Sequence, residues 1–174
     1  MKYEHPAAIY PGTFDPITKA HLSLILIGAR MFPSLTIIVA TNPEKATWFS
    51  AAERADLIRK IVQDEDVRIE VTKEFVPMHE AAMRASFVLR GLRSSMDFDY
   101  ETRLMRLYRR MNPRLQPVYV PTFPEDDMDL ISSSMVKSFV GPAGWEDAIR
   151  PFLPPSVYPA FVERAKLKVI ERML

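Results

Sequence analysis

Four segments carry side chains of the kinds that bind phosphates. The first is Tyr10-Pro-Gly-Thr-Phe-Asp-Pro-Ile-Thr-Lys-Ala-His21, in which a glycine turn leads directly into a threonine. A turn of this type lets backbone amides and a hydroxyl group approach a phosphate closely. His21 lies at the start of the next expected helix, where its imidazole and the positive helix end could face the same anion. The alternative interpretation is a proline-rich turn with a histidine that only caps the helix.

The other three segments are cationic or rich in hydroxyl groups. Arg90-Gly-Leu-Arg93 follows an apolar run, and two arginines around a glycine suit a bidentate grip on phosphate oxygens. Ile131-Ser-Ser-Ser-Met-Val-Lys137 places three hydroxyls and unpaired amides at a helix start, although ordinary capping needs only one serine. Lys45 lies in an expected loop, where a lysine by itself more often belongs to the solvated surface.

Missing residues and motifs exclude several classes of enzyme. The chain has no cysteine, which excludes disulfides, thiolate zinc sites and a cysteine nucleophile. It lacks G-x-x-x-x-G-K-[ST], G-x-G-x-x-G and G-x-S-x-G, which argues against a P-loop NTPase, a dinucleotide-dependent dehydrogenase and a serine hydrolase. The three histidines lack H-E-x-x-H spacing, so a zinc site is not expected, and no protein metal ligand is predicted.

Charge is nearly balanced overall but uneven along the chain. The net charge of +1 gives no general case for nucleic-acid binding. The stretch from Arg84 to Arg114 holds eight arginines against three acids, which favours a phosphorylated ligand or an acidic partner surface over DNA. Four acids between Glu125 and Asp129 could attract a cation, although such a run is more often a solvated loop.

Apolar runs and breaker residues predict which elements carry these segments. Five strands are expected, at Ala7–Tyr10, Leu35–Ala40, Val67–Val71, Ser86–Leu89 and Val118–Val120. Helices are expected at Leu22–Met31, after a capping box at Ser50–Glu53, within Glu74–Ala85 from Pro77 onward, and at Asp97–Met111, Ser132–Val140 and Val157–Met173. This alternation predicts an α/β, Rossmann-like, doubly wound parallel sheet of five strands. Ligands bind at the carboxyl ends of such strands, so the four segments should converge.

Length and composition favour one globular domain. The chain has 174 residues, 48% of them hydrophobic and 26% charged, which excludes disorder as the dominant state. We expect one domain over residues 1–174, with Gly141, Gly144 and Pro154-Pro155 punctuating a C-terminal helical part at 144–174. No apolar stretch is long enough to span a bilayer and no signal peptide opens the chain, so a cytoplasmic location without membrane association is expected.

In this order and spacing, the segments resemble the nucleotidyltransferase superfamily with the [HT]-x-G-H signature, and more narrowly the bacterial phosphopantetheine adenylyltransferases. The resemblance covers about residues 7–140 and includes Asp97-Phe-Asp-Tyr-Glu101 as well as the four segments. It implies transfer of the adenylyl group of ATP to 4′-phosphopantetheine, giving dephospho-coenzyme A and pyrophosphate in coenzyme A biosynthesis. It also implies Mg²⁺ bound with ATP, a homohexamer and feedback by coenzyme A.

The resemblance also implies roles for individual residues. Thr13 and His21 would hold the reacting phosphate, and Lys45 and Arg90 would bind the phosphate of the acceptor. The remaining acceptor contacts would come from Thr13, Val76, Leu104 and Tyr108. ATP would be bound by Thr13, Phe14, His21, Gly91, Leu92, Arg93, Glu101, Met128, Asp129, Leu130, Ile131, Ser132, Ser133 and Ser134.

The sequence departs from the family pattern at four places, which leaves alternatives open. Ala20 stands where the signature has glycine, and Tyr108 stands where the family usually has asparagine. Phe75-Val-Pro77 is atypical for the acceptor-binding strip, and Met128 replaces an aromatic residue near the adenine. A related adenylyltransferase acting on another phosphorylated acceptor, such as nicotinamide mononucleotide, is one alternative, although Arg90-Gly-Leu-Arg93 matches the phosphopantetheine branch. A non-catalytic nucleotide-binding homologue is the other.

Overall fold

The computed structural model describes residues 6–41, 46–121 and 131–173. Its strands are β1 (Ala7–Gly12), β2 (Ser34–Ala40), β3 (Val67–Thr72), β4 (Phe87–Leu92) and β5 (Gln116–Pro121). Its helices are α1 (Lys19–Met31), α2 (Ala51–Ile61), the 3₁₀ helix η1 (Val76–Met78), α3 (Glu80–Arg84), α4 (Ser95–Met111), α5 (Ser133–Ser138), α6 (Trp145–Ile149), the 3₁₀ helix η3 (Arg150–Phe152) and α7 (Tyr158–Met173).

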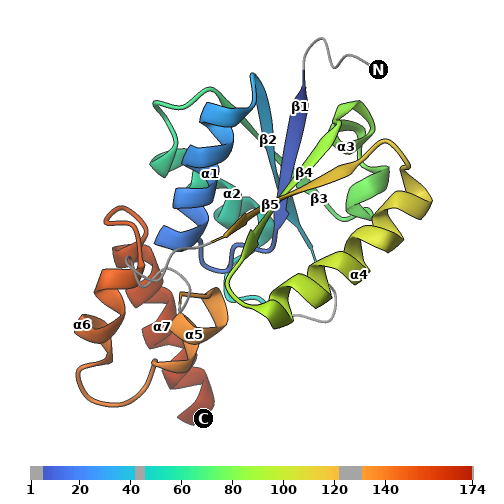
Figure 1. Cartoon of the computed structure of the whole chain (residues 1–174). Coiled ribbons are helices and arrows are strands. Elements are labelled where there is room, and N and C mark those ends of the chain that lie inside the picture. The colour runs from blue at the N-terminus through green and yellow to red at the C-terminus, as the bar shows by residue number, and fades with distance from the viewer. Residues whose placement is uncertain (1–5, 42–45, 122–130, 174) are drawn as a thin grey trace.

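The strands form one parallel sheet in the order β3-β2-β1-β4-β5. Helices α1 and α2 cover one face and α3 and α4 the other (Figure 1). The predicted five-stranded, doubly wound sheet is therefore confirmed. The order of strands reverses between β1 and β4, because the chain winds outward to β3 on one side and to β5 on the other. This is the position where such sheets bind ligands.

Alternating side chains of the strands fill two separate cores. Ala8 and Tyr10 of β1 pack in the larger core with α1 and α2, whereas Ile9 packs in the smaller core with α3 and α4. Leu35 and the residues Ile37–Val39 of β2 are buried, as expected of a central strand covered on both faces.

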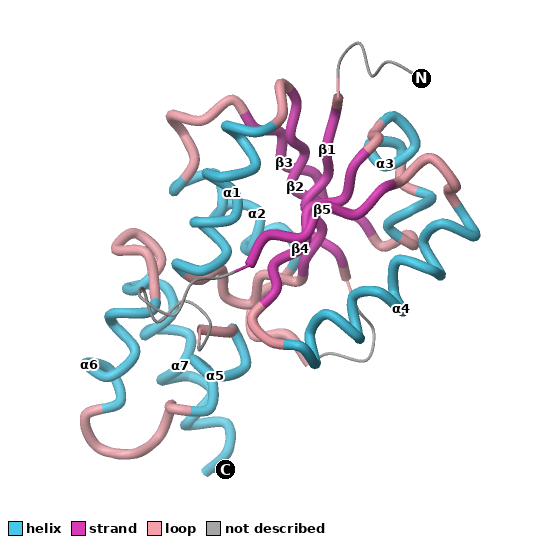
Figure 2. Tube along the Cα trace, viewed as in Figure 1, coloured by secondary structure: helices cyan, strands magenta, loops and turns pink. Residues whose placement is uncertain are grey.

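The C-terminal helices extend the larger core. Helices α5, α6 and α7 lie together beside one end of the sheet (Figure 2). Their buried side chains belong to the same apolar cluster as α1 and α2; these are Val136, Val140, Ile149, Leu153, Val157, Phe161 and Ala165. Helix α7 matches the predicted final helix, but α6 was not predicted. None of the helices in the described parts of the chain is long and apolar enough to cross a bilayer.

Two elements differ from the prediction at a proline. Strand β1 continues beyond Tyr10 through Pro11, which lies opposite Ile38 of β2. The expected helix in 74–85 is split, because Pro77 lies in η1 and the extended backbone of His79 ends it. His79 then caps α3, its Nδ1 accepting from the amide of Ala81 at 3.4 Å.

Candidate active site

At the carboxyl end of the sheet the backbones of β1 and β4 diverge, and we call this divergence the crevice. The two strands pair only at Ala8–Phe87 and Ile9–Val88, whereas β1 and β2 remain paired through Gly12. Arg90 bridges the gap, its Nη1 donating to the carbonyl oxygen of Pro11 at 3.1 Å. In a strand, the N–H and C=O of one residue point to the same side. The carbonyl of Pro11 points toward β4, so the N–H that proline lacks would also point to the side where β4 has diverged. A proline in a central strand is tolerated there because no ladder bond is lost.

The loop after β1 is packed tightly around an aromatic side chain. Phe14 has a positive φ of 53° and lies edge-on to the rings of Tyr10 and His21, with centroid distances of 5.3 and 5.2 Å. A Cβ atom at Gly12 would lie 2.7 Å from the Phe14 ring. The glycine of the predicted turn is therefore required by the packing of Phe14, in addition to any approach of a ligand.

His21 is oriented by a reciprocal cap at the start of α1. Its amide donates to Thr18 Oγ1 and its Nδ1 accepts from the Thr18 amide at 3.1 Å. Because Nδ1 accepts, the proton of the neutral ring resides on Nε2, which is left to donate elsewhere. Burial, together with the positive charge of Arg93, lowers the pKa of His21 to about 4. The ring is therefore a neutral hydrogen-bond donor near pH 7.

Arg90 is held rigidly on the opposite side of the crevice. Its Nε and Nη2 donate to the two carboxylate oxygens of Glu101 in α4, at 2.5 and 2.6 Å. Burial opposes the charge on Arg90, but the hydrogen bonds and charge of Glu101 outweigh it and raise the pKa of the guanidinium. Two of its five N–H groups have no partner among the described residues and could bind an anion. The sequence placed Glu101 with the nucleotide, and the structure adds that it orients Arg90.

The serine-rich segment is attached to the loop after β1, and its three serines differ. Ser132 caps α5 by accepting from the Met135 amide at 3.0 Å. Ser133 Oγ donates to the carbonyl oxygen of Pro16 at 2.8 Å, and Ser134 is exposed. Lys137 Nζ pairs with the buried carboxylate of Asp15 at 2.8 Å. Two segments separated by more than a hundred residues are thus joined at the carboxyl end of the sheet, as expected for strand-end segments that converge.

The remaining candidate residues lie around these groups or outside the described parts of the chain. Gly91 and Leu92 end β4, and Arg93 pairs with Asp97 at 2.8 Å. Val76 and Tyr108 pack in the smaller core. Burial raises the pKa of Tyr108, and the charges of Arg90 and Glu101 also act on its phenol. Leu104 is half-buried on α4 and Ile131 is buried. Lys45, Met128, Asp129 and Leu130, like the acidic run at 125–129, lie outside the described residues.

Sequence reasoning missed Arg54, whose buried side chain joins three backbone segments next to the site. It is 1% exposed and donates to three backbone carbonyls, those of Phe49 and Ala40 at 3.2 Å each and that of Thr13. These carbonyls belong to the segment before α2, the end of β2 and the loop after β1. A usable signal existed, because Arg54 falls at helical spacing on the apolar face that includes Leu57 and Ile58.

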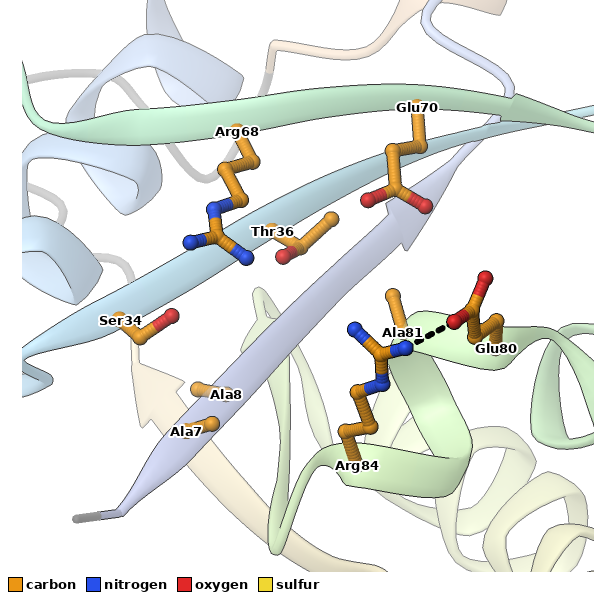
Figure 3. Close-up of a pocket in the computed structure, with 9 residues that line it drawn as sticks. All are labelled: Ala7, Ala8, Ser34, Thr36, Arg68, Glu70, Glu80, Ala81 and Arg84. Atoms are coloured by element: carbon orange, nitrogen blue, oxygen red, sulfur yellow. Dashed lines mark hydrogen bonds and ion pairs between the residues drawn. The ribbon is translucent and has the colours of Figure 1, made fainter.

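The described ranges hold no candidate metal cluster, and the small cavity found in the structure lies away from the site. Among the described residues, no group of three or more His, Asp or Glu side chains is arranged to hold a metal ion. A small cavity of about 80 Å³ lies instead at the amino ends of β1 and β2, beside α3 (Figure 3). The Arg84–Glu80 ion pair and the side chains of Arg68 and Glu70 line it. It is therefore separate from the crevice at the opposite strand ends.

Comparison with known proteins agrees with this architecture. The cytidylyltransferase-like family model matches residues 9–139. The phosphopantetheine adenylyltransferase of Chromobacterium violaceum is 36% identical over 155 residues, covering 87% of this chain and 92% of that protein. The enzyme of the same name from Syntrophotalea carbinolica is 40% identical over 151 residues, covering 86% and 88%.

Among solved structures, a Plasmodium falciparum nicotinic acid mononucleotide adenylyltransferase complexed with APC aligns with a TM-score of 0.65. It covers 94% of this chain and 98% of that one, but the identity of 14% makes it evidence for the fold alone. The extent and identity of the curated matches decide the narrower assignment. The chain is a nucleotidyltransferase, and it belongs to the phosphopantetheine adenylyltransferase family.

Proposed function

We propose that this chain transfers the adenylyl group of ATP to 4′-phosphopantetheine, releasing pyrophosphate and forming dephospho-coenzyme A. Family membership supports the reaction. The structural observation that carries the proposal is the crevice at the switch point between β1 and β4. Thr13 directly follows β1 and His21 lies in the first turn of α1, whereas Arg90 lies in β4 and binds the carbonyl oxygen of Pro11.

In the proposed reaction, an oxygen of the acceptor phosphate attacks the α-phosphorus of ATP and pyrophosphate leaves in line. No protein nucleophile is needed, so catalysis rests on positioning and on stabilising the charge that develops on the transferred group. His21 suits this role because Thr18 fixes its ring and leaves Nε2–H as the donor. We assign the hydroxyl of Thr13 to the same phosphate, from the adjoining turn.

We assign the acceptor phosphate to Arg90, together with Lys45. Arg90 suits this role because Glu101 and the Pro11 carbonyl hold the guanidinium in one orientation at the crevice. Glu101 then acts mainly by positioning Arg90, since both of its carboxylate oxygens accept from that guanidinium. Val76, Leu104 and Tyr108 would contact the rest of the acceptor.

ATP would lie along the loop after β1, the end of β4 and the serine-rich segment. Phe14, Gly91, Leu92, Arg93 and the residues 128–134 are its proposed contacts. Mg²⁺ would accompany the nucleotide, coordinated by phosphate oxygens and water. This form of binding fits the site, because its buried carboxylates, Asp15 and Glu101, are already paired with Lys137 and Arg90.

Ala20, which replaces the glycine of the family signature, does not disturb the groups on which this proposal rests. Ala20 is buried in the first turn of α1, and the next residue still forms the cap that orients its imidazole. A non-catalytic homologue is therefore less well supported than an active enzyme. Tyr108 bears on the acceptor, because it interacts electrostatically with Arg90, and it keeps another phosphorylated acceptor as the second candidate.

The experiment that tests the proposal is pyrophosphate release from MgATP with phosphopantetheine and nicotinamide mononucleotide as parallel acceptors. Release with phosphopantetheine alone is expected. Release only with the mononucleotide would transfer the protein to the second candidate function. No pyrophosphate release with either acceptor, despite measurable ATP binding, would support the non-catalytic alternative.

We also propose self-association, with a hexamer as the expected state, and feedback by coenzyme A. A groove of about 600 Å³ between α4 and β5 supports an interface on this side; apolar side chains such as Phe98, Met105 and Tyr119 line it together with Arg106, Arg109 and Arg110. Exposed Met96, Tyr100, Leu107 and Met111 form a second apolar stripe along another side of α4. Light scattering on a size-exclusion column tests the state, and a monomeric mass at micromolar concentration would contradict it.

A further inference from the structure

Resting on the proposed function, we infer that Arg164 of the C-terminal helix α7 is a positioning residue for the ATP half of the site. Its guanidinium donates to the carbonyl oxygen of Trp48 and pairs with Glu53 of α2. It also lies 4.7 Å from the centroid of the Phe49 ring. Arg164 thus holds the segment Trp48–Phe49 at three points: the Trp48 carbonyl, the Phe49 ring and the helix α2 that follows.

The indole of Trp48 is held by the same helix. It stacks on Phe161 of α7 with a centroid distance of 5.5 Å and an interplanar angle of 10°. Lys137 Nζ of α5, which pairs with Asp15, lies 5.8 Å from the centroid of the same ring. Helix α7 therefore determines where both the backbone and the side chain of Trp48 lie.

Trp48 and Phe49 in turn position the loop after β1. Their amides donate to the carboxylate of Asp15 at 2.9 to 3.1 Å, and Lys137 completes the contacts of that buried side chain. Asp15 directly follows Phe14, whose positive φ shapes the turn beneath Thr13. If the Trp48–Phe49 segment moves, Asp15 loses the donors that compensate its burial, and the turn loses its anchor.

The effect should be confined largely to ATP. The Asp15 junction joins the loop after β1 to the start of α5, and both are proposed ATP contacts. Of the two residues assigned to the acceptor phosphate, Arg90 is held independently of this segment by Glu101 and the Pro11 carbonyl. Helix α7 lies outside the region that the family model matches, residues 9–139, so that model gives Arg164 no role.

The test compares Arg164→Met with Lys166→Met on the same helix. Lys166 is 59% exposed and pairs with Glu146, away from the Trp48–Phe49 segment. Arg164→Met should raise the KM for ATP roughly three- to tenfold, the size of one lost hydrogen bond, while the KM for the acceptor changes less than about twofold. Lys166→Met should change neither constant. Equal increases in both KM values, or the same change in the control, would overturn the inference.

Two further variants separate positioning from general loss of stability. Arg164→Lys keeps the charge beside Glu53 but lacks the planar fork, so it should recover only part of the ATP effect. Lys137→Met and Arg164→Met should combine non-additively in the KM for ATP, since both act through Asp15. Full rescue by lysine combined with strict additivity would mean that Arg164 contributes only charge and stability.

Failure of the proposed function would leave the inference testable. If the wild-type chain released no pyrophosphate with either acceptor, calorimetric titration with MgATP would replace the kinetics. A dissociation constant weakened roughly three- to tenfold in Arg164→Met would then support the positioning role without the reaction. An unchanged constant, or no ATP binding by the wild type, would overturn it.

Discussion

The loop after β1 and the end of β4 face each other across the same crevice, but different interactions hold them. The loop is anchored through backbone groups: Arg54 binds the Thr13 carbonyl and Asp15 binds the amides of Trp48 and Phe49. The β4 side depends on one paired charge, Arg90 with Glu101. The backbone anchors determine the shape of a turn, whereas the ion pair determines the orientation of one cation. Damage to the first should affect folding and chemistry, and damage to the second should affect mainly the acceptor.

The largest expected effect on turnover comes from the loop side, at His21. His21→Ala should lower kcat by about two or more orders of magnitude, as loss of one transition-state donor does, with ATP affinity little changed. Steady-state turnover and ATP titration together test this. An unchanged kcat would remove His21 from the chemistry and leave it as a helix cap.

The next effect is on stability and concerns the backbone anchor. Arg54→Met should lower the free energy of unfolding by roughly 2–3 kcal/mol, because one buried and two part-buried carbonyls lose a donor and a buried group left unpaired costs about 1–3 kcal/mol. Arg59→Met is the control on the same helix, since Arg59 is 51% exposed and pairs only with Asp56 among the described residues. Urea denaturation of both variants measures the difference. Similar losses in the two would mean that the three carbonyls contribute little.

A smaller and more selective effect is expected on the β4 side. Arg90→Ala should raise the KM for the acceptor more than that for ATP, because the guanidinium is assigned to the acceptor phosphate. Initial rates over a grid of both substrates give the two constants. The reverse pattern would mean that the two sides of the crevice are exchanged. Glu101→Gln should reproduce the same pattern more weakly if Glu101 acts through Arg90.

The last expected effect is a pH dependence of stability. The folded-state pKa of His21, about 4, lies below the ordinary value of 6.5, so the folded chain binds fewer protons than the unfolded chain between these values. The His21 contribution to stability is therefore fully present above about pH 6.5 and is lost as pH falls toward about 4. Urea titrations at several pH values, compared between wild type and His21→Gln, isolate this contribution. Parallel curves for the two proteins would contradict the lowered pKa.

Much of the fold followed from local sequence patterns. The apolar runs located all five strands, and the capping box at Ser50–Glu53 located the start of α2. The predicted bounds were wrong at two prolines whose positions depend on tertiary contacts. Pro11 continues β1 because β4 has diverged beside it, and the split of the 74–85 segment depends on the His79 cap. The short helix α6 has only five residues and showed no usable periodicity.

By itself, the sequence determined which residue types stand at the strand ends and that a doubly wound sheet should bring them together. Both depend on local spacing and on the period of apolar side chains, which are properties of neighbours in the chain. Only the tertiary structure decided which of these residues touch. Arg90 with Glu101, Lys137 with Asp15, and Arg164 with Trp48 join segments separated by 11 to 122 residues. Such pairs depend on how helices pack around the sheet, and one sequence contains no direct signal of that packing.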